Sequence, residues 1–295
     1  MLPARRGVLA VTVAVTFWSI GNMIVRGTDL TGPQVAFWRY LFAALIYAAG
    51  HRVFVGPIRW ADFKVAAPTG VMLAVEIALF FIAIKTTTVA NVTVIGALTP
   101  LLLFGVAARR FNERISVGVL VATLVAVLGV AVVVFGSSGE ATWSIRGDLL
   151  AIGALVFFAA YFALGKAARE SLSSVTLQTH SLIAGTPVLA LALLLETGGL
   201  PAPDGSQWWF VVGLIVFPST GHFLIGWAHA HVPLILVSLM TLAVPVLSIV
   251  GAVFLFDESV VPVQVVGVIV VLVVLAYAIY ETSRFDNEPI AEPAP

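Results

Sequence analysis

The stretch at residues 98–113, LTPLLLFGVAARRFNE, is the one from which the rest of the chain can be interpreted. A second stretch, AVPVLSIVGAVFLFDE at residues 243–258, repeats its pattern. Each is an apolar run that contains a proline, Pro100 or Pro245, and ends in a glutamate 13 residues later. The two copies lie 145 residues apart. Because each falls fourth among the apolar runs of its own half, they predict a duplicated membrane unit.

The composition places the chain in a membrane. It has 295 residues, of which 60% are hydrophobic and only 10% charged, and its mean hydropathy is +1.08. A soluble domain carries about 25% charged residues. Cysteine is absent, which excludes disulfides, iron–sulfur clusters and thiolate zinc sites. The net charge is zero and no basic block is present, so nucleic acid is not an expected partner.

Ten apolar runs are each long enough to cross the hydrocarbon core as a helix, for which about 20 residues are needed. We place them near residues 7–26, 33–54, 64–84, 89–109, 115–136, 147–167, 174–196, 207–229, 232–255 and 261–281. The first run is too long for a signal peptide and no cleavage site follows it, so we interpret it as a span.

Lysine and arginine are distributed unequally between the two sides of the membrane that these spans define. Eleven fall on the side of the N-terminus and C-terminus, three fall on the other side, and Arg39 lies within a span. The eleven are Arg5, Arg6, Arg52, Arg59, Lys64, Arg109, Arg110, Arg114, Lys166, Arg169 and Arg284. By the positive-inside rule, both termini are expected in the cytoplasm.

The duplication divides the chain. We expect a first repeat of five spans over residues 1–140, a second over 141–282, and a disordered cytoplasmic tail over 283–295. Because five is odd, the second half enters the bilayer inverted relative to the first. The predicted fold is therefore an all-α integral membrane protein whose ten transmembrane helices form an inverted-topology repeat around a central cavity.

Two five-span halves, with a proline in the fourth span and a glutamate at its exit, resemble the EamA-type members of the drug/metabolite transporter superfamily. Further matching stretches are AFWRYLFAALI at 36–46, IKTTTVANVTVIGALTP at 84–100 and HVPLILVSLMTLAVPV at 231–246. The chain looks closest to bacterial amino-acid exporters, including exporters of aromatic amino acids. The resemblance implies a basket of ten helices, with the third, fourth, eighth and ninth spans prominent in the cavity wall.

Two charged residues inside spans are candidates for substrate binding, because such residues are costly unless they face water or a partner. Glu76 lies twelve residues into the third span and could bind an amine or a proton, or could be a neutral packing group. Phe80, one turn later, would place an apolar wall beside it. Arg39 in the second span could bind a carboxylate or extend its charge to the membrane surface.

Two histidines are further candidates. His180 falls in the seventh span at the place that matches Arg39, with one residue of slippage. His222 lies deep in the eighth span, on a helical stripe with Pro218, Ile225 and His229. Either histidine could line the cavity or be a hydrogen-bonded packing residue. His229 and His231 lie at a span end and on different helix faces, which does not favour a metal site, so no metal or cofactor is expected.

Aromatic and amide residues complete the candidate site. Trp18 and Tyr161 lie in the first spans of the two halves and could line a cavity for flat apolar substrates, although ordinary packing is the alternative for each. Asn22, one turn from Trp18, is a polar group in an apolar span. Pro100, Pro245 and Pro218 are candidates for helix kinks or gating positions, because proline leaves backbone carbonyls unpaired.

The sequence favours a secondary transporter that exports small organic solutes, most of all amino acids with aromatic or apolar side chains, by alternating access. No GxxxxGK[ST] motif for ATP is present. One alternative is an antiporter of phosphorylated sugars or nucleotide-sugars, which would need several buried basic groups. Another is a membrane-embedded lipid-modifying enzyme, which would need convergent catalytic groups. We therefore expect no enzyme, and a chain whose partners are its solute and the lipid bilayer of the inner membrane. A single chain would suffice to form the cavity.

Overall fold

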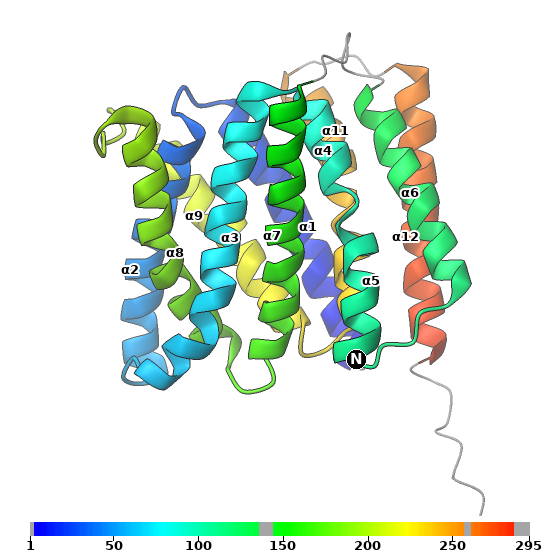
Figure 1. Cartoon of the computed structure of the whole chain (residues 1–295), viewed down its shortest axis with the longest axis horizontal. Helices are drawn as coiled ribbons and strands as arrows, with labels where there is room; N and C mark the ends of the chain where they lie inside the picture. The colour runs from blue at the N-terminus through cyan, green and yellow to red at the C-terminus, as the bar shows by residue number, and fades with distance from the viewer. Residues whose placement is uncertain (1–2, 136–143, 257–260, 286–295) are drawn as a thin grey trace, which may run out of the picture.

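The computed structural model describes residues 3–135, 144–256 and 261–285, and the regular structure within these ranges is α-helical. In chain order the helices are α1 (Pro3–Arg26), α2 (Gly32–Phe54), α3 (Trp60–Thr86), α4 (Val89–Gly96), α5 (Thr99–Arg110), α6 (Val117–Phe135), α7 (Ile145–Ala168), α8 (Ser174–Thr197), α9 (Gln207–Ala228), α10 (Leu234–Met240), α11 (Ala243–Phe256) and α12 (Pro262–Phe285). The long helices run side by side across the molecule (Figure 1).

Nine segments of the described residues are long and apolar enough to cross a membrane. They correspond to nine of the ten predicted spans. The exception is α2, which contains Arg39 and carries His51 and Arg52 in its last turn. These polar residues lower its hydropathy, so length and composition alone do not identify it as a span.

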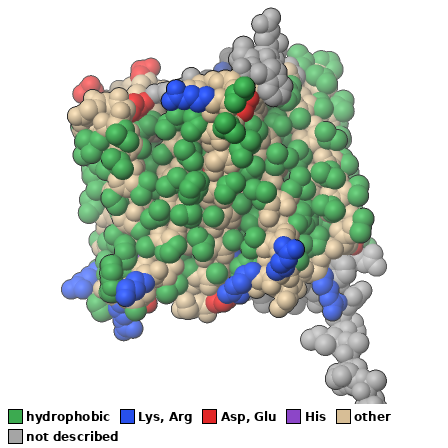
Figure 2. All heavy atoms as spheres, viewed as in Figure 1, with side chains coloured by type: hydrophobic (Ala, Val, Ile, Leu, Met, Phe, Trp, Pro, Cys, Tyr) green, Lys and Arg blue, Asp and Glu red, His purple; other side chains and the backbone are tan. Residues whose placement is uncertain are grey.

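The surface has the character of a membrane protein. Figure 2 shows hydrophobic side chains over the middle of the visible face, with lysine and arginine mostly along the lower edge. Large apolar side chains are widely exposed, among them Phe254 at 81% and Leu195 at 79%. In water such an apolar band would be an aggregation hazard, whereas hydrocarbon solvates it. We call the lower end, where α5 and α7 end, the Arg-rich face (Figure 1).

Hydroxyl side chains determine where several helices begin. Each accepts a hydrogen bond from a backbone N–H three residues later, which otherwise lacks an intrahelical partner. The pairs are Thr31 with Gln34, Thr88 with Asn91, Ser144 with Gly147 and Ser173 with Thr176. A cap of this kind stabilises a helix by about 1 kcal/mol. The capping residues therefore fix the start of helices whose apolar sequence alone would not define it.

The fourth and ninth predicted spans are each made of two helices. α4 ends at Gly96 and α5 begins at Thr99, while α10 ends at Met240 and α11 begins at Ala243. The two breaks share a detail, because a threonine hydroxyl donates to a carbonyl three residues earlier. Thr99 Oγ1 lies 2.6 Å from the Gly96 oxygen, and Thr241 Oγ1 lies 2.6 Å from the Ser238 oxygen.

The prolines predicted to interrupt these spans lie just after the breaks. Pro100 is in the first turn of α5 and Pro245 in the first turn of α11. A proline is well tolerated there, because the first N–H groups of a helix have no intrahelical partner. Pro218 lies inside α9, and the Leu214 carbonyl four residues before it is 3.5 Å from the Ser219 hydroxyl. That hydroxyl takes the place of the missing proline N–H.

The helices of the two halves interleave. α3 packs along α7 and α8, α1 along α9, and α2 along α8, so most of the extensive interfaces join the first half to the second. α6 and α12 pack along each other at one edge (Figure 1). The core is consequently shared, with residues of both halves in a single large cluster.

Glu113 links the two halves near the Arg-rich face. It follows α5, and its carboxylate accepts hydrogen bonds from the backbone nitrogens of Leu234 at 2.6 Å and Ile235 at 3.1 Å, at the start of α10. Its Oε1 also lies 3.1 Å from Nζ of Lys166 at the end of α7. The glutamate at the exit of the fourth span therefore secures the entry of the ninth. The matching residue, Glu258, lies outside the described residues.

The C-terminal helix is longer than predicted. α12 continues to Phe285, so residues 283–285, assigned from the sequence to a tail, belong to the helix. The rest of that predicted tail, residues 286–295, lies outside the described residues.

Replacing Gly70 with alanine is expected to destabilise the protein, because α3 and α8 touch backbone to backbone there. An added Cβ would overlap the Ser181 backbone, and on the other side a Cβ at Gly185 would lie 3.0 Å from the Gly70 oxygen. Overpacking of this kind costs about 1–3 kcal/mol. Thermal unfolding in detergent measures it. Gly50→Ala in α2, where an added Cβ meets nothing within 4 Å, is the matched control and should not lower the transition temperature.

Candidate functional site

A group of polar side chains gathers where four helices face one another. It comprises Arg39 and Tyr40 of α2, Glu76 of α3, Tyr161 of α7 and His222 of α9. Arg39 interacts electrostatically with Glu76, and both interact with Tyr161. The sequence predicted four of these five as separate candidates. The fold brings all five together.

Arg39 and Glu76 are the two opposite charges of this group. The Arg39 guanidinium carbon lies 5.1 Å from the centre of the Tyr40 ring, and its Nε is buried without a hydrogen-bond partner. Both Arg39 and Glu76 keep part of their surface exposed. An arginine with a free donor and a carboxylate close enough to interact with it form a site of matched opposite charges.

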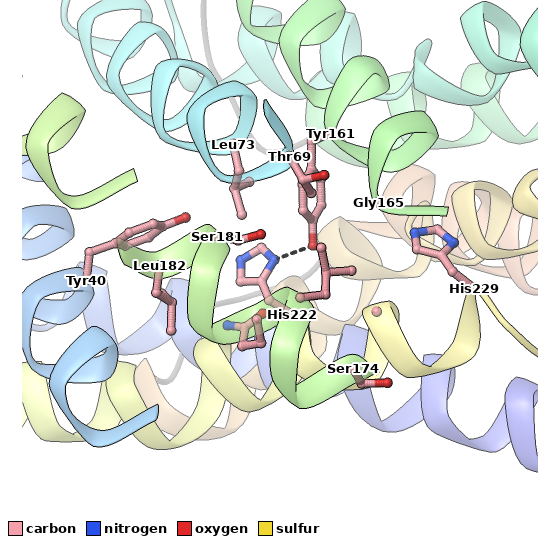
Figure 3. Close-up of a pocket in the computed structure, with 13 residues that line it drawn as sticks. Tyr40, Thr69, Leu73, Tyr161, Gly165, Ser174, Ser181, Leu182, His222 and His229 are labelled. Atoms are coloured by element: carbon pink, nitrogen blue, oxygen red, sulfur yellow. Dashed lines mark hydrogen bonds between the residues drawn. The ribbon is translucent and has the colours of Figure 1, made fainter. Parts of the chain in front are cut away.

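Aromatic rings stand beside these charges. The Tyr161 hydroxyl lies 3.0 Å from Nδ1 of His222, as the dashed line in Figure 3 marks. The Trp18 ring centre lies 4.8 Å from that of His222 and 6.2 Å from that of Phe158. Phe158 in turn stacks on Tyr161 at 5.9 Å. Trp18, Tyr161 and His222 thus form one aromatic wall, to which Phe158 belongs although sequence reasoning did not select it.

Three other predicted residues lie outside this group. Asn22 is exposed and donates to the Ser248 hydroxyl at 3.2 Å, so it joins α1 to α11. Phe80 packs with a small cluster that includes Ala83, Val92 and Ala151. His180 is fully buried, with Nδ1 2.8 Å from the Thr176 oxygen one turn earlier in α8.

The neighbour of His180 is a second buried histidine. The ring of His51, at the end of α2, lies 5.5 Å from that of His180, with the planes nearly perpendicular. His51 also contacts the Gly56 oxygen at 3.1 Å and the Thr176 hydroxyl at 3.3 Å. His180 therefore faces α2 near the Arg-rich face, where it takes part in packing rather than in the central group.

A narrow cavity runs from the central group toward the Arg-rich face, between α3, α7, α8 and α9. In Figure 3, Tyr40 and His229 lie at its two ends, with His222 between them. Its volume is about 20 Å³, which is room for about one water molecule. We call this cavity the slot. Sequence reasoning did not foresee it, because it is formed by how four helices pack and not by any spacing within one of them.

Polar groups without partners line the end of the slot near the Arg-rich face. The hydroxyls of Thr69 and Ser174 and both ring nitrogens of His229 are buried and make no hydrogen bond.

Comparison with known proteins gives two findings. The sequence profile described as the EamA-like transporter family matches residues 5–135 and again residues 145–280. A solved structure, described only as a crystal structure of a protein, superposes with a TM-score of 0.80 over 95% of this chain and 99% of that one. Its sequence identity is 17%, so the likeness concerns the fold. No curated protein sequence matches the chain.

Proposed function

Because the chain belongs to the EamA-like transporter family, we propose that it is a secondary transporter that exports small organic solutes, in particular amino acids with aromatic or apolar side chains. The observation that carries this proposal is the pair of opposite charges, Arg39 and Glu76, beside the aromatic wall of Trp18, Tyr161 and His222. A zwitterion carries one carboxylate and one ammonium group. In this proposal Arg39 binds the carboxylate and Glu76 binds the ammonium group.

The surroundings of the pair suggest the side chain that the solute carries. Trp18 and Phe158 are partly buried rings on the same side as Tyr161. Aromatic pairs in offset or edge-to-face arrangement contribute about 0.5–1.5 kcal/mol beyond the area that they bury. An aromatic amino acid would therefore be bound through its charges at Arg39 and Glu76, and through its ring against this wall.

The transport cycle that we propose is alternating access between two five-span halves. α2 is taken as the tenth span, since it is 23 residues long and lies beside α8 within the same bundle. The two matches to the family profile support repeats over residues 1–140 and 141–282. With five spans each, the halves would have inverted topology, which allows one central site to open toward either side.

The orientation that we propose puts the Arg-rich face in the cytoplasm and the protein in the inner membrane. It rests on the eleven-to-three distribution of lysine and arginine. A reporter fused after Pro295 is expected to give the signal of a cytoplasmic location. A periplasmic signal would contradict both the orientation and the even number of spans.

Counterflow into liposomes tests the proposed solutes. Protein reconstituted with unlabelled phenylalanine or tryptophan inside should accumulate the labelled amino acid from outside. Nucleosides and sugar phosphates, run in the same panel, should not exchange. Exchange of sugar phosphates without amino acids would contradict the proposal and favour the alternative of an anion antiporter.

Pro100→Ala and Pro245→Ala are each expected to leave a folded protein with altered transport rates. Each proline lies in the first turn of a helix that follows a break, where it prevents the two short helices from joining into one. Alanine would favour a continuous helix and so change the shape of the cavity wall. Counterflow rates measure the effect. Wild-type rates in both variants would mean that the prolines only contribute to packing.

A further inference from the structure

We infer that the solute crosses the half of the bilayer next to the Arg-rich face through the slot, which here is closed. The inference rests on the proposed transport function and adds to it the route on one side of the central site. From Tyr40 of the central group the slot passes the Tyr161–His222 pair and reaches Thr69, Ser174 and His229. It thus joins the proposed binding site to the face where α7 and α9 end and α8 begins (Figures 1 and 3).

The polar lining of the slot is unusual for a packed core. Thr69, Ser174 and His229 are 1%, 6% and 4% exposed, and their side-chain polar atoms lack partners. A buried polar group without a hydrogen bond costs about 1–3 kcal/mol. Apolar side chains would fill the same space without that cost. The lining is explained if another conformation widens the slot and lets water and solute satisfy these groups.

The end of the slot is closed by non-covalent contacts, which would break if the helices moved apart. The Arg169 guanidinium, at the end of α7, donates from Nε to the Gly226 oxygen of α9 at 2.9 Å and from Nη1 to the Leu172 oxygen. On the α3 side, the backbones of Gly70 and Ser181 touch. The Arg169 hydrogen bonds close the slot on the side of α7 and α9, and the backbone contact closes it between α3 and α8. None of these contacts is covalent.

The two halves differ in the way that alternating access requires. Under the proposed inverted repeat, α3 corresponds to α9 and α8 corresponds to α2, so the interface between α3 and α8 has its counterpart between α9 and α2. α3 packs extensively along α8, whereas α9 makes far fewer contacts with α2. The interface between α3 and α8 is therefore tight, and its counterpart between α2 and α9 is loose. If the first interface loosened while the second tightened, the slot would open.

Cysteine labelling tests the route directly, because the chain contains no cysteine of its own. Ser174→Cys and Thr69→Cys each introduce one thiol of similar size into the slot. Ser171→Cys is the exposed control, in the loop between α7 and α8 at the same face. Thr123→Cys is the buried control, since Thr123 is 0% exposed and lies in α6, away from the slot.

A membrane-impermeant methanethiosulfonate is applied separately to each side of sealed vesicles, and Ser171→Cys identifies the side of the Arg-rich face. From that side, both slot thiols should react at about 0.1–10% of the Ser171→Cys rate, the population of a typical minor conformation. Thr123→Cys should react more slowly than either. From the other side, the slot thiols should be protected.

Two results would overturn the route. One is slot thiols that react no faster than Thr123→Cys, and the other is reaction only from the side opposite to the Arg-rich face. Neither reading requires a known solute. If the slot thiols react as expected but amino-acid counterflow fails, the proposed substrate is refuted and the route is kept. If counterflow is intact but the slot thiols do not react, the route alone is refuted.

Discussion

Replacing Glu113 with glutamine is expected to lower the free energy of unfolding by about 3 kcal/mol, as breaking a buried ion pair commonly does. The Glu113 carboxylate lies 3.1 Å from Nζ of Lys166, and the two side chains are only 10% and 16% exposed. It also accepts from the backbone nitrogens of Leu234 and Ile235. Glutamine would turn an N–H donor toward one of these nitrogens and leave the Lys166 ammonium without its counter-charge.

The chain contains a matched control for this substitution. Glu170 pairs with Arg110 at 3.0 Å near the same face, but these side chains are 54% and 55% exposed. An exposed pair contributes about 0–1 kcal/mol, so Glu170→Gln should leave the thermal transition almost unchanged. Both variants are to be compared by thermal unfolding in detergent. Equal shifts of the transition temperature in the two variants would show that the link between Glu113 and the start of α10 does not hold the halves together.

Glu76→Gln is expected to weaken amino-acid binding by roughly 10- to 100-fold, the loss of one charge-assisted hydrogen bond in a partly desolvated site. Arg39→Gln should have an effect of similar size on the same ligands. Ligands with a single charge separate the two roles. Phenylethylamine should lose affinity only in Glu76→Gln, and phenylpropionate only in Arg39→Gln, because each ligand reaches one member of the pair.

A different outcome would give Glu76 another role. If it carries a coupling proton, Glu76→Gln should abolish the pH dependence of transport while counterflow stays intact. If neither binding nor pH dependence changes, Glu76 is a neutral packing residue and the cavity selects its solute by shape and apolar surface. Affinity and counterflow measured for this variant across a range of pH distinguish all three cases, with Glu170→Gln as the control for loss of a carboxylate elsewhere.

Much of the fold could be predicted from the sequence because the bilayer limits the possible structures. Apolar runs of about 20 residues must be helices in hydrocarbon, so nine spans followed from length and composition. The repeated pattern around Pro100 and Pro245 predicted the duplication that the two family matches support. The breaks themselves were placed less well, since they precede the prolines by a few residues and also involve Thr99 and Thr241.

The site could be predicted only in part. Arg39 and Glu76 stand out in any sequence, because charges within spans are rare and costly. Their proximity depends on how α2 and α3 are rotated, and no spacing reports that rotation. His180 illustrates the limit, since its position in the repeat matched Arg39 but its ring packs on His51. Thr69 and Ser174 gave no signal at all, because small hydroxyl residues are common in helices of every kind.

The weak apolar character of α2 has a consequence for how the chain enters the bilayer during synthesis. Arginine opposes insertion of a helix by up to about 2.5–3.5 kcal/mol, the value at the helix centre, and Arg39 is the eighth of the 23 residues of α2, which does not qualify as a span by its composition. The next helix, α3, is long and apolar enough to span the membrane and carries Glu76, the electrostatic partner of Arg39. The short connection between them lets the two enter as a helical hairpin. Insertion of α2 would then wait until α3 has left the ribosome, so a nascent chain that ends before Glu76 would hold its second segment outside the membrane.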